Sequence, residues 1–473
     1  MSLIRSVGLG AYVAIFSFGF GSGCRSTAPS PLVGVENPRP NLTQPQPGGA
    51  LSPGVAQVAY REPPSEVLPQ PAEELDRFAS AGELSLAPLI QEVQSRNRSL
   101  QAMVAAWQAA AQRYPQVVSL DDPMLGFMVA PNALGQSDLS GGQGYMVSAS
   151  QKLPWFGKRD LRGETAAAEA SAARLDVEDA RLRLIETVKL AFFDYYLVHR
   201  EQELNFQNQR IVEDFRETAL AKYRANQVPQ QDVLQADVER GEITRRQIEL
   251  ERMRQVAAAR INTLLHRAAD HALPDPPRAL PAPGTLASTD LLQQRAMERR
   301  PDLAALGAHE RAAEAAADSA RQEFYPDVEI AARYDAIGMD EPYRAQVGMN
   351  VNIPLYHERR RAALREAQYK VCQRRAEYEA RLDEIHNEVQ GAAAQVLEAR
   401  RMMALYHDTI LPASEQNVES AKSGYAAGQV DFLRLMDAQR QLVLLREKAD
   451  EAEVDYHRRS AALERIVGDP LSP

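Results

Sequence analysis

The sequence has few cysteines, no long apolar run in its interior and no cluster of charge of one sign. Its 473 residues include only 2 cysteines, Cys24 and Cys372, and their positions support no disulfide pattern. Cys372 lies in a helical pattern and is expected to be a buried or idle thiol. No apolar run reaches the roughly 18 residues of a membrane-spanning helix. The formal net charge of −10 is spread along the chain, which argues against a nucleic-acid surface.

The signatures of an enzyme are also missing. Histidines that fall in helical patterns lack metal-ligand spacing and are expected to be surface or packing residues. They are His199, His357, His386, His407 and His457. No glycine-rich phosphate loop is present. We therefore expect no enzymatic activity, no cofactor and no metal site, so any energy source must be another protein.

The N-terminus reads as an export signal. Residues 1–23 contain a basic residue, a mostly apolar stretch and then small residues, which is typical of a signal peptide. The stretch that ends at Cys24 resembles a bacterial lipoprotein box, with Gly21 where that motif usually has Leu. The resemblance implies lipidation at Cys24; the alternative is ordinary cleavage nearby. Residues 24–82 are rich in Pro, Gly, Gln and Ser and are expected to form a lipid-anchored linker without a core.

Polar and apolar residues alternate between Tyr343 and Pro354. Val347, Met349 and Val351 are apolar, and the residues between them are small or polar. A period of two predicts a strand with one apolar and one polar face. Strands are predicted at about 123–130, 144–153, 326–335 and 343–353.

Most of the remaining chain favours helix. Residues 158–224 contain no proline, and a helix of that length would extend for about 100 Å. A rod of this length cannot fold back on one compact core, so its apolar stripe must pack on other long helices, as in a coiled coil. A second long helix is expected at 357–424, and each long helix is followed by a return helix.

The plan of the chain is used twice. "Gln-Lys-Leu-Pro-Trp-Phe-Gly-Lys-Arg" (151–159) corresponds to "Val-Asn-Ile-Pro-Leu-Tyr-His-Glu-Arg" (351–359), and "Tyr-Arg-Ala-Asn-Gln-Val" (223–228) corresponds to "Tyr-Ala-Ala-Gly-Gln-Val" (425–430). The predicted unit is helix, β-hairpin, long helix and return helix. The repeats are expected at 83–267 and 289–473, with a Pro-rich linker at 268–288.

Four strands are too few to form a closed transmembrane barrel from one chain. A sheet that spans a membrane must close, since lipid satisfies no exposed edge, and spanning barrels have about eight strands or more. One chain supplies four. The sequence therefore predicts a mainly α protein that oligomerises around an axis to complete a transmembrane β-barrel, with two copies giving eight strands and three giving twelve. The alternative is a small soluble sheet packed on helices.

Four motifs, taken together and in order, carry a family resemblance. They are "Leu-Pro-Trp-Phe-Gly-Lys-Arg" (153–159), "Arg-Arg-Pro-Asp-Leu" (299–303), "Phe-Tyr-Pro-Asp-Val" (324–328) and "Gly-Tyr-Ala-Ala-Gly-Gln-Val-Asp-Phe-Leu-Arg-Leu-Met-Asp-Ala-Gln" (424–439). With them, residues 83–467 resemble the TolC-like outer-membrane efflux protein family, the outer membrane factors. "Asp-Asp-Pro-Met-Leu-Gly" (121–126) and "Trp-Phe-Gly-Lys-Arg" (155–159) are most similar to the heavy-metal efflux branch of this family.

The resemblance implies a homotrimer in the bacterial outer membrane, with a 12-stranded barrel and an α-helical periplasmic tunnel. It implies docking to a periplasmic adaptor, the membrane fusion protein, and to an inner-membrane pump of the resistance-nodulation-division type. It also implies a gate at the far ends of the tunnel helices. The matching gate positions are Asp437, Arg434, Tyr425, Asp232 and Tyr223.

Arg434 stands where the family often has Asp, and it is expected to pair with Asp437. The implied adaptor-docking tips are Asn226, Gln227, Gly428 and Gln429. The alternative for each acidic residue is a solvated helix face or a first-turn position favoured by the helix dipole. For the tips it is a plain interhelical turn in which Gly428 supplies a positive φ.

These features predict the outer-membrane exit duct of a tripartite efflux system, which passively conducts small toxic solutes such as drugs or metal ions. One alternative, of a different class, is a periplasmic coiled-coil scaffold or adaptor that never spans a membrane. A second is an exit duct for type I protein secretion. The sequence does not name the cargo, because a wide duct need not bind its cargo tightly.

Overall fold

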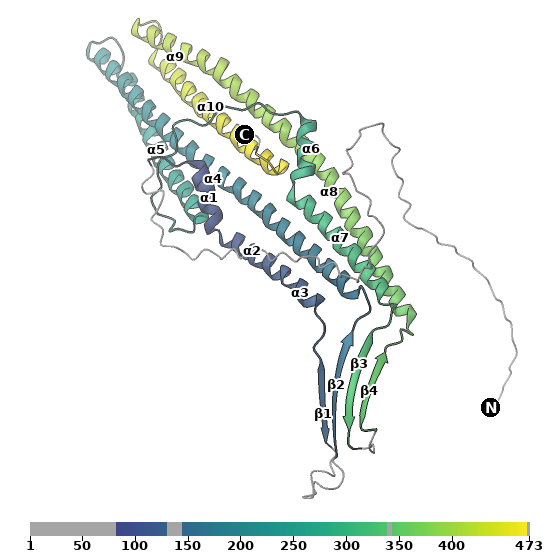
Figure 1. The fold of residues 1–473 in the computed structure, drawn as a ribbon. Helices are drawn as coiled ribbons and strands as arrows, with labels where there is room; N and C mark the ends of the chain where they lie inside the picture. Colours follow the sequence, from purple (N-terminus) through teal and green to yellow (C-terminus); the bar gives the residue numbers. More distant parts are fainter. Residues whose placement is uncertain (1–81, 130–143, 338–342, 471–473) are drawn as a thin grey trace, which may run out of the picture. The chain divides into compact units, whose positions relative to one another are not determined.

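The computed structural model describes residues 82–129, 144–337 and 343–470. The predicted signal peptide, Cys24 and nearly all of the predicted N-terminal linker lie outside these residues. Within them, the structure consists of two sets of helices and one small sheet, so it is mainly helical, as predicted. Figure 1 shows the strands extending from one end of the helices, with the α4–α5 and α9–α10 turns at the opposite end.

The elements follow the same order twice along the chain. The first set is α1 (Leu86–Arg96), α2 (Arg98–Ala111), α3 (Arg113–Val118), β1 (Met124–Val129), β2 (Tyr145–Leu153), α4 (Lys158–Arg224) and α5 (Gln230–Leu264). The second set is α6 (Thr289–Arg299), α7 (Pro301–Gln322), β3 (Val328–Asp335), β4 (Ala345–Val351), α8 (His357–Leu405), η2 (Tyr406–Ile410), α9 (Leu411–Ala426) and α10 (Phe432–Val467).

The four strands form one antiparallel sheet in the order β1-β2-β3-β4. Residues opposite each other in an antiparallel pair lie on the same face, so the register sorts the side chains. One face, the apolar sheet face, carries Leu125, Phe127, Val129, Tyr145, Val147, Ala149, Leu153, Val328, Ile330, Ala332, Tyr334, Ala345, Val347, Met349 and Val351, with Gln151 as its polar member.

The other face of the sheet, the polar sheet face, carries Ser148, Ser150, Lys152, Glu329, Arg333, Asp335, Gln346 and Asn350. Met124, Met128 and Met146 are its large apolar residues. Bonds between side chains cross this face: Arg333 donates from Nε to Gln346 Oε1 at 2.7 Å. The period of two in the sequence therefore separates polar from apolar residues in β2, β3 and β4, whereas β1 has apolar or small residues on both faces.

The helix α4 is 67 residues long and uninterrupted. It begins after Gly157, whose φ of 81° is in the left-handed region that glycine adopts without strain. No proline occurs between its ends, so every backbone N–H beyond the first turn finds a carbonyl four residues earlier. The helix packs against α5, α7 and α10. These contacts, rather than helix propensity, stabilise such a rod.

The second long helix differs from the prediction, because it is not α-helical throughout 357–424. A π-helical segment, η2, separates α8 from α9, and the N–H of Leu411 donates to the carbonyl of Tyr406. Pro412 follows directly. Proline lacks an N–H and its ring collides with the carbonyl four residues earlier, here that of Asp408, so one wider turn accommodates it.

The helical segment before β1 is divided into α1, α2 and α3. Asn97 ends α1 and caps α2 by accepting from Leu100 N at 2.9 Å. Of the two expectations for Cys372, a buried or an idle thiol, the first is wrong, because Cys372 is exposed on α8.

The hydrophobic core is divided along the helices. One cluster joins α1, α4, α5 and α10 and includes Phe192, Tyr196, Ile261 and Val454; a second joins α6, α7, α8 and α10. A third lies where the α4–α5 and α9–α10 hairpins meet. None of the described helices combines the length and apolar character needed to span a membrane.

Candidate functional site

The two tips, which are the turns after α4 and α9, have the same backbone geometry. Gln227 N donates to Lys222 O at 2.9 Å, and Gln429 N donates to Gly424 O at 2.8 Å. Each bond spans five residues and closes a Schellman motif, in which one residue adopts a left-handed conformation. That residue is Asn226 (φ 53°) in the first tip and Gly428 (φ 72°) in the second. The positive φ predicted for Gly428 is confirmed.

Tyr425 joins the two hairpins below the tips. Its hydroxyl donates to Asp232 Oδ2 at 3.3 Å, from α9 to α5. The ring is buried, with its centroid 5.4 Å from that of Phe432. Burial, together with the neighbouring Asp232 carboxylate, raises the pKa of Tyr425 to about 12. The residue therefore keeps its hydroxyl proton at neutral pH and remains a hydrogen-bond donor.

Asp232 sits in a partly buried position against this tyrosine. Burial raises the pKa of its carboxyl group, and the charge of Asp431 adds to this effect. The Tyr425 hydroxyl and the Lys222 ammonium act in the opposite direction. Two predicted gate residues, Tyr425 and Asp232, are thus in direct contact, whereas Tyr223 lies 39 % exposed on the last turn of α4.

The predicted pair between Arg434 and Asp437 is wrong for the single subunit. Asp437 Oδ1 instead lies 3.4 Å from Arg440 Nη1. Arg440 also donates from Nε to Glu239 Oε2 of α5 at 2.6 Å, so it connects the two hairpins. Arg434 is an exposed residue of the first turn of α10, where its backbone N–H is capped by Asp431 Oδ1 at 3.0 Å.

Polar contacts, one of them buried, connect the helices behind the tips. Gln439 Nε2 of α10 donates to Asn208 Oδ1 of α4 at 2.9 Å, and both side chains are buried. Asp237 of α5 accepts from Arg216 Nε at 2.6 Å. Buried amide pairs of this kind fix the register of packed helices, because any slip leaves both groups unsatisfied.

A second group of residues connects the sheet to the helices. Lys158 is 1 % exposed, and its Nζ donates to Asp327 Oδ1 at 2.9 Å and to Tyr325 O at 3.0 Å. Burial alone would raise the pKa of Asp327, but the bonds from Lys158 and from the Trp155 backbone hold that pKa below its ordinary value. The rings of Trp155 and Tyr325 stack with centroids 5.7 Å apart. Two of the sequence motifs, 153–159 and 324–328, therefore meet here.

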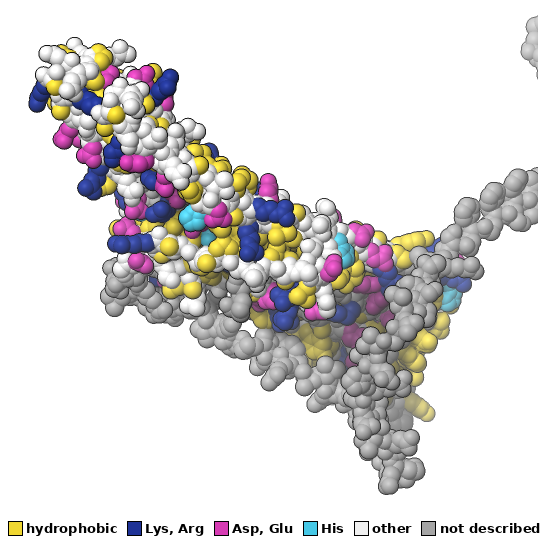
Figure 2. Space-filling view, turned by 90° about the horizontal axis from the view of Figure 1, so that it is seen from above, with side chains coloured by type: hydrophobic (Ala, Val, Ile, Leu, Met, Phe, Trp, Pro, Cys, Tyr) yellow, Lys and Arg dark blue, Asp and Glu magenta, His cyan; other side chains and the backbone are white. Residues whose placement is uncertain are grey.

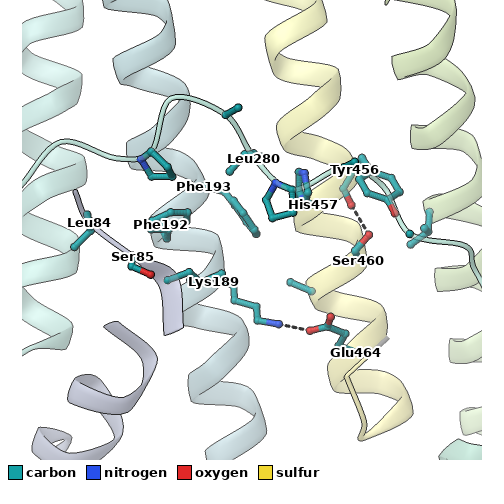
Figure 3. Close-up of a pocket in the computed structure, with 18 of the residues that line it drawn as sticks. Leu84, Ser85, Lys189, Phe192, Phe193, Leu280, Tyr456, His457, Ser460 and Glu464 are labelled. Atoms are coloured by element: carbon teal, nitrogen blue, oxygen red, sulfur yellow. Dashed lines mark hydrogen bonds and ion pairs between the residues drawn. The ribbon is translucent and has the colours of Figure 1, made fainter. Parts of the chain in front are cut away.

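A cavity of about 600 Å³ lies farther along the helices. Figure 3 shows Phe193 of α4 extending toward His457 of α10, with Leu280 of the inter-repeat linker beside them; Phe192 and Tyr456 also line the cavity. At its lower edge Lys189 and Glu464 form an ion pair.

His457 in this cavity is a packing residue. Its ring centroid lies 5.4 Å from that of Phe193, and burial lowers the pKa of the imidazole to about 4, so it is neutral at pH 7. Nothing in the lining identifies a ligand.

The surface carries charges of both signs. Figure 2 shows basic and acidic side chains interspersed along the helices on the face that it presents. Across residues 82–129, 144–337 and 343–470, no group of three or more His, Cys, Asp and Glu is arranged to hold a metal ion.

Sequence reasoning missed Lys222, Arg440 and Glu239. Each contacts a helix about 200 residues away in the chain. No local pattern distinguishes these charged residues from the many solvated ones on the same helices. Their distance along the chain from the tips could have indicated them, since all three residues lie within a few turns of a tip.

Comparison with known proteins supports one class of protein. Residues 292–469 match the family model described as outer membrane efflux protein. No curated protein sequence matches the chain. Among solved structures, CusC, described in terms of folding and transmembrane channel formation, is 17 % identical with a TM-score of 0.68, covering 84 % of this chain and 96 % of CusC.

Two further structures have the same fold. The outer membrane protein VceC from Vibrio cholerae is 18 % identical with a TM-score of 0.68, covering 82 % of this chain and 97 % of VceC. The open state of the Neisseria gonorrhoeae outer membrane channel MtrE is 20 % identical with a TM-score of 0.65, covering 82 % of this chain and 89 % of MtrE.

The fold is therefore that of outer membrane channel proteins. Together with the family match over the second repeat, it confirms that the chain resembles the outer membrane efflux protein family. The first repeat lies outside the matched residues.

Proposed function

We propose that this protein is the outer-membrane exit duct of a tripartite efflux system and that it passively conducts small toxic solutes. Three copies surround one axis. Their sheets close a 12-stranded barrel, and their helices form a periplasmic tunnel that docks to an adaptor and an inner-membrane pump. The chain is anchored further by lipid at Cys24. The match of residues 292–469 to the outer membrane efflux protein model carries this proposal.

The sheet supports a barrel wall rather than a soluble sheet. On the apolar sheet face Val347 is 83 % exposed and Met349 is 66 % exposed in the single subunit. Large apolar side chains concentrated on one face need a cover, and lipid provides one. The polar sheet face would line the lumen. The edge strands β1 and β4 would pair between neighbouring copies, because an open edge is not tolerated in a membrane.

The tips support a gate and a docking surface. The Tyr425–Asp232 bond joins the two hairpins of one chain, so breaking it frees one hairpin to move against the other. Three copies of Asp437 would surround the axis, and Arg440 would neutralise part of that ring. The exposed residues Asn226, Gln227, Gly428 and Gln429 would form the adaptor-docking tips.

The experiment that tests the duct has two parts. Purified protein should form oligomers that resist heating in the outer-membrane fraction and should conduct ions in planar bilayers. Absence of both would favour the periplasmic scaffold or adaptor instead. A duct for protein secretion would show the same conductance, and the transport of dyes and metal ions in a deletion strain would separate the two kinds of cargo.

A matched pair of substitutions tests the barrel register. Met349→Arg should destabilise the inserted barrel by about 2–4 kcal/mol near the middle of a bilayer, whereas Asn350→Arg should cost much less because it points into the lumen. Heat-modified mobility of the folded protein on gels measures both. Equal losses in the two variants would rule out the assignment of faces.

A further inference from the structure

We propose that Lys222 is a latch residue that holds the α9–α10 hairpin against α4 by capping the C-terminal end of α9. The inference rests on the proposed function, in which the tips form the constriction of the duct. It adds a positioning residue to the Tyr425–Asp232 contact, and that residue carries a charge rather than a neutral hydroxyl group.

The hydrogen bonds and the ring contact of the Lys222 side chain all reach the other hairpin. Its Nζ donates to the backbone oxygen of Tyr425 and, at 3.2 Å, to that of Ala426. The same Nζ lies 4.3 Å from the centroid of the Tyr425 ring, within the range of a cation–π interaction. Lys222 belongs to α4 and its partners belong to α9, so one side chain makes three contacts across the two repeats.

The charge of Lys222 suits the end of α9. The last carbonyl groups of a helix have no partner within the helix, and they lie at the negative end of its dipole. Tyr425 O also accepts from Gly428 N at 3.2 Å as part of the tip turn. The ammonium therefore binds the carbonyls that the turn leaves under-satisfied, and a charge-assisted bond of this kind is stronger than a neutral one.

The second repeat has no lysine at the position equivalent to Lys222. Since residues 223–228 correspond to residues 425–430, Lys222 corresponds to Gly424. A Cβ at Gly424 would lie 2.6 Å from Val430 Cγ2, so a side chain at Gly424 would have to displace Val430. Each chain thus has one such lysine, on the α4 side, and a trimer would have three.

The latch also explains why Tyr425 is held so firmly. Its hydroxyl is bound by Asp232, its backbone oxygen is bound by Lys222, and its ring lies beneath the Lys222 ammonium. Movement of the α9–α10 hairpin away from α4 and α5 must break all of these contacts together. Removing one of them should therefore shift the closed tip toward an open one.

The test is single-channel recording on the purified full-length protein, with the fraction of time in the open state as the readout. Lys222→Met keeps the aliphatic stem and removes the charge, and we expect the open-to-closed ratio to rise about ten-fold, the factor that one charge-assisted hydrogen bond sustains. Lys222→Arg should restore the wild-type ratio. Lys422→Met removes a charge from an exposed position on α9 and should leave the ratio unchanged.

The outcomes separate the latch from the duct. Equal open fractions in Lys222→Met, Lys422→Met and wild type would overturn the latch, and so would an open tip in Tyr425→Phe together with a closed tip in Lys222→Met. Failure of the wild-type protein to conduct at all would overturn the proposed function instead. Should Lys222→Met not assemble, Lys222→Glu sets a carboxylate against the same carbonyls; it should open the tip further, and a closed tip in this variant would overturn the latch.

Discussion

Replacing Asp302 by Asn should weaken the junction of α7, α8 and α10 more than any comparable change on a helix surface. Arg300 is only 4 % exposed, and it donates to both carboxylate oxygens of Asp302, from Nε at 2.9 Å and from Nη2 at 2.7 Å. Arg381 of α8 donates to the same carboxylate at 3.0 Å. Arg300 also reaches Glu388 at 2.6 Å and the backbone oxygen of Ile466 at 3.2 Å.

The size of the effect follows from the pKa of Asp302. Burial alone would raise this pKa, but the two arginines outweigh burial and lower it from 3.8 to about 2. A difference of that size corresponds to about 2 kcal/mol of folding free energy. Because the pKa is lower in the folded state, this stabilisation is fully present above the ordinary pKa and is lost as the pH falls through the folded value. Asp302→Asn should thus cost about 2 kcal/mol at neutral pH and much less near pH 2.

Urea unfolding of the detergent-solubilised protein, followed by circular dichroism, measures this cost. The matched control is Asp318→Asn on the same helix, whose pair with Arg321 at 2.7 Å is about half exposed on both sides. Exposed pairs contribute about 0.5 kcal/mol or less, so the control should be nearly neutral. The reasoning would be refuted if the two variants lost equal stability, or if the Asp302→Asn loss did not shrink in acid.

Three further changes are expected to have measurable effects. Lys158→Met should cost about 3 kcal/mol in the same unfolding assay, because it leaves the partly buried Asp327 carboxylate without its cation. The control is Arg162→Met, which removes an exposed ion pair with Glu323 close to Lys158. Gly468→Ala should cost about 1–2 kcal/mol, since φ is 78° and a Cβ would lie 3.1 Å from backbone atoms of Arg299; no loss of thermal stability would contradict this. Cys24→Ser should abolish labelling by a radioactive lipid precursor, and unchanged labelling would rule out lipidation there.

Some features of the fold could be predicted because they depend on neighbours within one or two turns. The alternation around Met349 assigns a face to each residue of a strand, and the sheet register agrees with it in β2, β3 and β4. The absence of proline from Lys158 to Arg224 predicts a single helix, which is what forms. Pro412 could have predicted the π segment before it, because the clash of a proline with the preceding turn is also a local effect.

By itself, therefore, the sequence determined the duplicated plan, the strand faces, the long first helix and the turn at Gly428. Only the tertiary structure decided which charges meet. Asp437 pairs with Arg440 rather than Arg434, Lys222 caps a helix about 200 residues away, and these partners depend on how one hairpin packs against another. Every helix offers many charged residues at similar spacing, so local periodicity cannot choose among them. The choice follows from the register in which buried side chains pack, and that register is set by the whole bundle at once.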